Sequence, residues 1–130
     1  MATMKHSTHS VTLEVPYERA FDYLSDWRNQ PQWAINFVKG MRKQGEQLFM
    51  TTPFGEVPVE WRTDRDLGTI DIIFPGNNVL PTRLTAMGDD TLVYTFTFSM
   101  PPDVSEEAFQ EGQLGMEQEL QHLKRILEAS

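Results

Sequence analysis

The chain has 130 residues, of which 39% are hydrophobic and 23% are charged, and 11 Lys and Arg against 19 Asp and Glu give a formal net charge of -8. This length suits one hydrophobic core and predicts a single domain over residues 1–130. The acidic balance disfavours nucleic acid as a partner, because phosphate binding needs clustered Lys and Arg. The sequence contains no cysteine, which excludes disulfides, thiolate metal sites and cysteine nucleophiles.

The sequence also lacks the features that would place it in a membrane or in a secretory pathway. No stretch approaches the roughly 20 apolar residues that span a bilayer, and the first ten residues lack the apolar centre of a secretory signal. We therefore expect no integral membrane association and a cytoplasmic location.

The N-terminal part of the chain predicts one strand followed by two short helices. Alternating apolar residues from His9 to Val15 are typical of a half-buried strand. Pro16 suits the first turn of a helix, and apolar residues follow it at helical spacing, which predicts a helix over 16–25. A second helical segment should begin near Asp26, and Pro31 should divide it into short pieces.

Six further strands, separated by turn residues, are predicted in the middle of the chain. Their expected ranges are 37–43, 47–52, 54–64, 69–74, 80–87 and 92–100. The last has the clearest pattern, with one apolar face and one face rich in hydroxyl groups. Short connections with Gly, Pro and Asn favour an antiparallel arrangement.

A long amphipathic helix is predicted over residues 104–129. Asp103 and Glu106 have the spacing of an N-terminal capping box. The apolar stripe of the helix contains Phe109, Gly112, Met116, Leu120, Leu123 and Leu127. Residues 103–130 hold seven acidic and two basic residues, so they carry -5 of the net charge of -8. Since a sheet with one apolar face needs a cover, we expect an α+β fold in which a curved antiparallel sheet of about seven strands surrounds this helix.

The segment Val11–Asp26, VTLEVPYERAFDYLSD, resembles the opening of the START-like superfamily, also called SRPBCC, which includes polyketide cyclase/dehydrase-like proteins. The segment from Trp27 to Trp33 is similar to the tryptophan-bearing second helix of that family. The resemblance covers the whole chain in the order of its elements. It implies a helix-grip fold with an apolar cavity between sheet and helix, in which members bind lipids, sterols, polyketides, quinones or plant hormones. It implies no catalytic residue, because the superfamily has no shared catalytic motif.

Large aromatic residues and small residues on facing surfaces predict a ligand cavity. The candidate ligand-binding residues are Trp33, Phe37, Trp61, Tyr94, Phe96, Phe98, Phe109, Gly112, Met116 and Leu120. Gly112 and Gly115 lie in a helix, where each glycine costs about 1 kcal/mol relative to alanine. They either leave space for a ligand or let helix and sheet pack closely. Trp27, Trp33 and Phe37 either close the mouth of the cavity or anchor the short helices.

The candidate catalytic residues are His9, Tyr94 and Glu119. His9 lies on the apolar face of the first strand and titrates near neutral pH, although a solvated strand start would also explain it. Apolar walls would raise the pKa of the Glu119 carboxyl, unless this side chain reaches solvent. His6 and His9 point to opposite faces of a strand, so we expect no metal site, and we expect no cofactor.

Three functional hypotheses follow from these features. The leading one is a module that binds a small hydrophobic or amphipathic ligand, such as a lipid or a polyketide. One alternative is a polyketide cyclase/dehydratase-like enzyme that uses polar groups in the cavity. The other is a module for a protein partner, in which the acidic face of the C-terminal helix docks on a basic protein.

Overall fold

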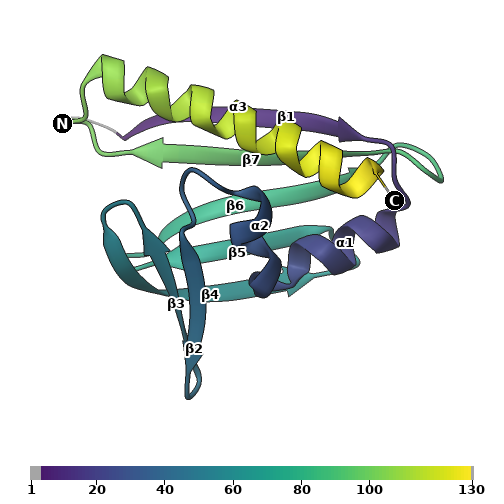
Figure 1. Ribbon diagram of the computed structural model, residues 1–130, viewed down its shortest axis with the longest axis horizontal. Coiled ribbons are helices and arrows are strands. Elements are labelled where there is room, and N and C mark those ends of the chain that lie inside the picture. The colour runs from purple at the N-terminus through teal and green to yellow at the C-terminus, as the bar shows by residue number, and fades with distance from the viewer. Residues whose placement is uncertain (1–3, 130) are drawn as a thin grey trace.

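The computed structural model describes residues 4–129, in which a seven-stranded antiparallel sheet curves around the side that carries the helices (Figure 1). The strands are β1 (Lys5–Leu13), β2 (Gly40–Gln44), β3 (Gln47–Thr52), β4 (Gly55–Asp64), β5 (Thr69–Phe74), β6 (Asn78–Ala86) and β7 (Leu92–Met100). The helices are α1 (Tyr17–Ser25), the short 3-10 helix η1 (Trp27–Asn29), α2 (Gln30–Trp33) and the long α3 (Glu106–Glu128). The predicted α+β helix-grip fold is confirmed, with two short helical segments between α1 and β2.

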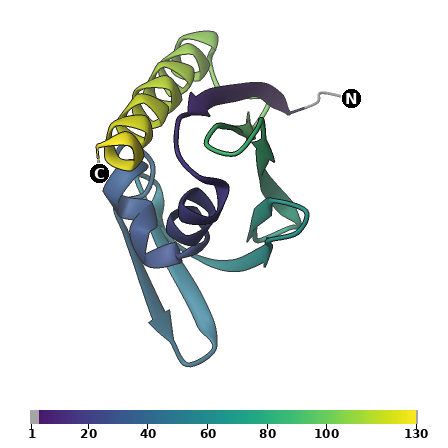
Figure 2. The same ribbon diagram turned by 90° about the vertical axis from the view of Figure 1, so that its right-hand side faces the viewer.

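The strands follow the order β1-β7-β6-β5-β4-β3-β2, so the first strand joins the last and the others form a meander. The sheet curves at β4, since its first half pairs with β3 and its second half pairs with β5. The hairpin of β2 and β3 consequently projects away from α3, as Figures 1 and 2 show. The same curvature keeps the side of the sheet formed by β2 and β3 apart from the start of α3 (Figure 1).

The core fills the space between the inner face of the sheet, α1 and the second half of α3. Its fully buried leucines are Leu13, Leu24, Leu92, Leu120, Leu123 and Leu127. At about 100° per residue, the three buried leucines of α3 fall on one stripe, and every second residue of β7 from Leu92 to Phe98 is buried. The helical spacing of apolar residues in α3 and their alternation in β7 therefore place these residues in the core.

Several predicted boundaries are wrong. The first strand begins at Lys5 and ends at Leu13, whereas it was predicted from His9 to Val15, and the strand predicted over 80–87 is β6 at Asn78–Ala86. Ser105, and not Asp103, caps α3, because the Ser105 hydroxyl accepts a hydrogen bond from the Ala108 N–H at 3.1 Å. The strand predicted over 37–43 begins only at Gly40, since residues 35–37 form a turn. The reason for this turn lies in the site described next. Within residues 4–129, no helix has the length and apolar character needed to cross a membrane.

Candidate ligand-binding site

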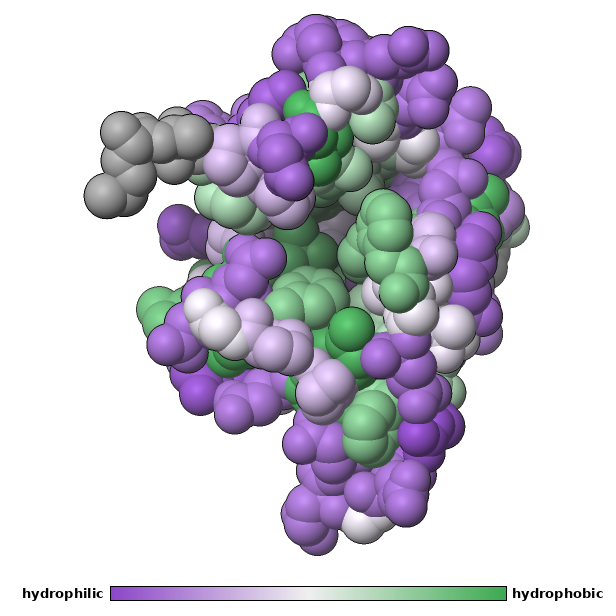
Figure 3. Space-filling view, turned by 90° about the vertical axis from the view of Figure 1, so that its left-hand side faces the viewer, coloured by the Kyte–Doolittle hydropathy of each residue, from purple (hydrophilic) through white to green (hydrophobic). Residues whose placement is uncertain are grey.

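An apolar hollow opens to the surface between the first half of α3 and the ends of several strands, and Figure 3 shows its hydrophobic floor. It consists of two adjoining pockets of about 230 Å³ and about 400 Å³. Both are lined by Phe37, Phe54, Phe98, Met100 and Met116, so we treat them together as the outer pocket. Phe54 stands at its rim with 85% of its surface exposed.

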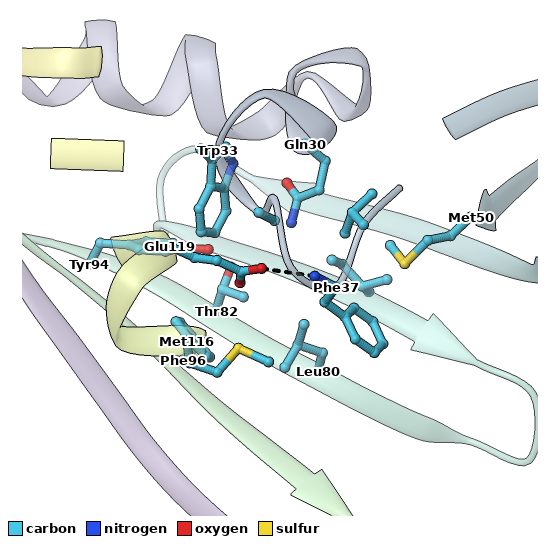
Figure 4. Close-up of a pocket in the computed structure, with 13 residues that line it drawn as sticks. Gln30, Trp33, Phe37, Met50, Leu80, Thr82, Tyr94, Phe96, Met116 and Glu119 are labelled. Carbon is cyan, nitrogen blue, oxygen red and sulfur yellow. Dashed lines mark hydrogen bonds between the residues drawn. The ribbon is translucent and has the colours of Figure 1, made fainter. Parts of the chain in front are cut away.

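A smaller cavity, the inner cavity, lies deeper between α2, α3 and strands β5 to β7 (Figure 4). Its volume of about 30 Å³ provides room for a water-sized group. Phe37, Leu80 and Met116 line both the inner cavity and the outer pocket. These three side chains therefore separate the inner cavity from the surface.

Four polar side chains face the inner cavity among otherwise apolar walls: Gln30, Thr82, Tyr94 and Glu119. The Thr82 hydroxyl donates to the carbonyl oxygen of Ile70 at 2.6 Å and is also hydrogen-bonded to the Tyr94 hydroxyl. Burial raises the pKa of Tyr94 far above its usual value, so its hydroxyl keeps its proton. Tyr94 can thus act as a hydrogen-bonding group here but not as a base at neutral pH.

Glu119 is buried, with only 2% of its surface exposed, and does not reach solvent. Its Oε2 accepts hydrogen bonds from the backbone N–H groups of Asn36 at 2.7 Å and Phe37 at 2.9 Å. The Asn36 side chain in turn donates to the carbonyl oxygen of Gly115 at 3.0 Å. Burial raises the pKa of the Glu119 carboxyl, while the two N–H groups and Lys39 oppose the rise. These contacts fasten the turn that carries Phe37 to α3, and they explain why β2 begins late.

His9 lies on the inner face of β1, as predicted, but it is buried and not at a solvated strand start. Its Nδ1 is 2.6 Å from Glu117 Oε1, and its Nε2 is 2.9 Å from Ser7 Oγ. This order of hydroxyl, imidazole and carboxyl is that of a hydrolytic triad. None of the three residues lines the outer pocket or the inner cavity, so we interpret the group as a tie between β1 and α3.

Most predicted ligand-binding residues line the outer pocket or the inner cavity. Trp33, Tyr94 and Phe96 line the inner cavity, Phe98 and Gly112 line the outer pocket, and Phe37 and Met116 line both. Three predicted residues line neither space. The Trp61 Nε1–H donates to the Ser25 carbonyl oxygen at 2.9 Å, Phe109 stacks on Phe98 with ring centroids 5.8 Å apart, and Leu120 is fully buried in the core.

Two alternatives were left open: Trp33 and Phe37 could close the cavity or anchor the short helices, and the glycines of α3 could leave space for a ligand or permit close packing. Trp33 is buried edge-on against Tyr94, which anchors α2, whereas Phe37 stands at the boundary of the cavity. A Cβ atom on Gly112 would lie 3.1 Å from Phe98 Cζ, and one on Gly115 would lie 3.4 Å from Asn36 Nδ2. The glycines thus permit close packing on α3.

Sequence reasoning missed Gln30 and Thr82 in the inner cavity and Phe54 at the rim. Gln30 precedes a proline in a short helix without periodicity, and Phe54 lies in a turn, so neither residue carries a pattern that assigns it a face. Thr82 could have been found, because it is two residues from Leu84 on β6 and shares its face. Within residues 4–129, no group of three potential metal-ligating side chains is present.

Comparison with solved structures finds the same fold over nearly the whole chain. The XoxI protein from Bacillus cereus has a TM-score of 0.75 at 14% identity and covers 95% of this chain and 96% of its own. A START superfamily protein from Mycobacterium smegmatis has a TM-score of 0.71 at 14% identity, with 98% and 99% covered. The Zhui aromatase/cyclase from Streptomyces sp. R1128 has a TM-score of 0.75 at 12% identity, also with 98% and 99% covered.

These similarities define the class of the fold: the chain has the START-like, or SRPBCC, helix-grip fold. The sequence itself matches no protein-family model and no curated protein. At 12% to 14% identity, the solved structures establish the fold and leave the function to be argued from the site.

Proposed function

We propose that this protein binds a small hydrophobic or amphipathic molecule in the outer pocket and the inner cavity. The observation that carries the proposal is an open apolar hollow that is separated by Phe37, Leu80 and Met116 from an inner cavity with four polar side chains. Apolar walls with a few convergent polar groups are typical of small-molecule sites. A ligand that buries roughly 200 Å² of apolar surface would gain about 5 kcal/mol at about 25 cal/mol per Å².

A cyclase- or dehydratase-like activity is the second candidate. It is supported by the similarity to a structure described as an aromatase/cyclase and by the position of Tyr94 and Glu119 at the inner cavity. A buried carboxyl with a raised pKa and a protonated phenol can transfer or hold a proton next to a bound substrate. His9 is not part of this candidate, because it lies outside the inner cavity and the outer pocket.

Native mass spectrometry of the protein purified from its own host tests the binding function. We expect a small molecule to remain bound to the wild-type chain and to be absent from a Met116→Trp variant, whose larger side chain blocks the space between the outer pocket and the inner cavity. Gln121→Trp, on the exposed side of α3, is the matched control and should retain the molecule.

Two outcomes would contradict the proposal. One is a wild-type chain that carries no small molecule and whose melting temperature is unchanged by a library of apolar compounds. The other is a bound molecule that both tryptophan variants retain equally, which would place its site elsewhere. Turnover of a cyclisable polyketide mimic by the wild type, lost in Glu119→Gln with binding preserved, would instead support the enzyme.

A further inference from the structure

The inner cavity contains a polar group with no partner. The Gln30 side chain is buried, with 6% of its surface exposed, and its amide makes no hydrogen bond within residues 4–129. Figure 4 shows this amide pointing from α2 into the inner cavity, towards Glu119 and Phe37. The amide atoms of Gln30 are not fully enclosed by protein atoms, so a group that enters the inner cavity can reach and bind them.

Glu119 offers the second unused hydrogen-bonding atom. Its Oε2 is engaged by the N–H groups of Asn36 and Phe37, whereas its Oε1 has no partner in the described part of the chain. Thr82 and Tyr94 bind each other, and the Thr82 proton is donated to Ile70. Gln30 and the Glu119 Oε1 are therefore available to a ligand, and so is the Trp33 Nε1–H, a buried donor in the lining of the inner cavity that has no hydrogen-bond partner among the described residues.

The charge of the site excludes anionic ligand ends. Among the described residues, no lysine or arginine lines the inner cavity or the outer pocket. Lys39, the cation nearest in sequence to this turn, donates its Nζ to the Ile35 carbonyl oxygen at 3.0 Å. A carboxylate or a phosphate in the inner cavity would lose its hydration beside Glu119 with no lysine or arginine in the cavity wall to compensate, and the charge of Lys39 already acts on Glu119.

We infer that the inner cavity binds an uncharged hydroxyl group of the ligand through Gln30 and Glu119, while the apolar body of the ligand lies in the outer pocket, and that ligands ending in an anion are rejected. The inference rests on the proposed function. A hydroxyl both donates and accepts, so it can donate to an ionised Glu119 and accept from either the Gln30 amide or a protonated Glu119. It also matches the volume of about 30 Å³.

The hydroxyl end of the ligand must pass Phe37, Leu80 and Met116 to reach the inner cavity. Met116 is unbranched and flexible, and it is partly exposed, so it can turn away from Phe37. Phe37 is held at its backbone by Glu119, and its ring packs edge-on against Phe74 with centroids 6.4 Å apart. The path therefore opens mainly by movement of the methionine.

Three probes with the same ring system and different ends test the inference: naphthol, naphthoate and methylnaphthalene, substituted at the same ring position. Their affinities for the wild-type chain are measured at neutral pH by isothermal titration calorimetry. We expect naphthol to bind about three- to tenfold more tightly than methylnaphthalene, as one or two buried hydrogen bonds allow. Naphthoate should bind most weakly.

Two variants test whether Gln30 and Glu119 cause the preference for naphthol. Gln30→Met keeps the length of the side chain but lacks the amide, so it should remove the preference for naphthol over methylnaphthalene. Glu119→Gln keeps an acceptor for the two N–H groups and removes the charge, so naphthoate should gain the most affinity. Gln121→Met, on the exposed side of α3, is the control and should behave like the wild type.

The outcomes separate the inference from the function on which it rests. If naphthoate binds as tightly as naphthol, or if Gln30→Met preserves the naphthol preference, the inference is wrong while ligand binding stands. If none of the three probes binds the wild-type chain, the proposed function fails and the inference fails with it.

Discussion

Glu119 supplies hydrogen bonds that a strand partner would otherwise supply. The N–H groups of Asn36 and Phe37 both point to its Oε2, which holds residues 35–37 in a turn. Sequence periodicity placed Glu119 beside the apolar stripe of α3 but gave no sign of the turn that it binds, 83 positions earlier in the chain. A contact between one side chain and a distant backbone leaves no pattern in the sequence.

The difference in stability between the wild-type chain and its Glu119 variants should depend on pH. Burial raises the pKa of this carboxyl above 4.5, so the folded chain holds its proton to a higher pH than the unfolded chain does. The stabilisation from that proton is present at low pH and is lost as the pH rises through the folded pKa. We therefore expect Glu119→Gln to match the wild type at pH 4 and to be the more stable protein at pH 7, as measured by urea denaturation.

Glu119→Ala is the informative contrast at this position. It leaves two backbone N–H groups without an acceptor, at a cost of about 1–3 kcal/mol each if they stay buried. This loss should appear at both pH values. A Gln variant that is as unstable as the Ala variant at pH 7 would show that the charge itself, and not the hydrogen bonds, holds the turn.

At the scale of the elements, three strands were predicted with their observed limits. The ranges 47–52, 69–74 and 92–100 match β3, β5 and β7, because Gly and Pro residues in the adjoining turns mark where each strand begins and ends. The start of α3 was misplaced, since Asp103 and Ser105 are both good capping residues and only the backbone geometry decides between them. Propensity alone does not resolve a choice between neighbouring caps.

Substitution of each candidate cap distinguishes the two residues. Ser105→Ala removes the acceptor of the Ala108 N–H and should cost about 1 kcal/mol of unfolding free energy. Asp103→Ala should change the stability by less than about 0.5 kcal/mol, as exposed substitutions usually do. Chemical denaturation of both variants checks this, and equal losses would contradict the assignment of Ser105.

The packing of α3 on β7 gives a further prediction. Gly112→Leu would push a side chain against Phe98, whose Cζ already lies within 3.1 Å of the position of a Cβ. We expect a loss of roughly 1–3 kcal/mol from overpacking. Thermal melts of Gly112→Leu and of the control Gln121→Leu, which changes an exposed position of the same helix, measure this loss of stability. An unchanged melting temperature would show that the outer pocket has room for the new side chain.

At the scale of the whole molecule, the hollow results from the different ways in which the two halves of α3 meet the sheet. Towards its end, Leu120, Leu123 and Leu127 are buried in the core, whereas near its start Gly112 and Met116 line the outer pocket. The resemblance to the helix-grip fold predicted a space between sheet and helix. Its polar inner end was predicted only in part: Tyr94 and Glu119 were candidates, whereas Gln30 and Thr82 were not, because no single periodicity connects residues that come from different elements.

The pairing of β1 with β7 also constrains how the chain folds. Lys5 lies opposite Met100 and Leu13 lies opposite Leu92, so the first strand leaves the ribosome long before the strand that pairs with it. Until then, Val11 and Leu13 have neither a partner strand nor the cover of α3. Pairings between residues so far apart in sequence slow folding, which for such topologies takes on the order of milliseconds to seconds. During synthesis, β1 is consequently the segment of this sheet most open to capture by a chaperone or by another nascent chain.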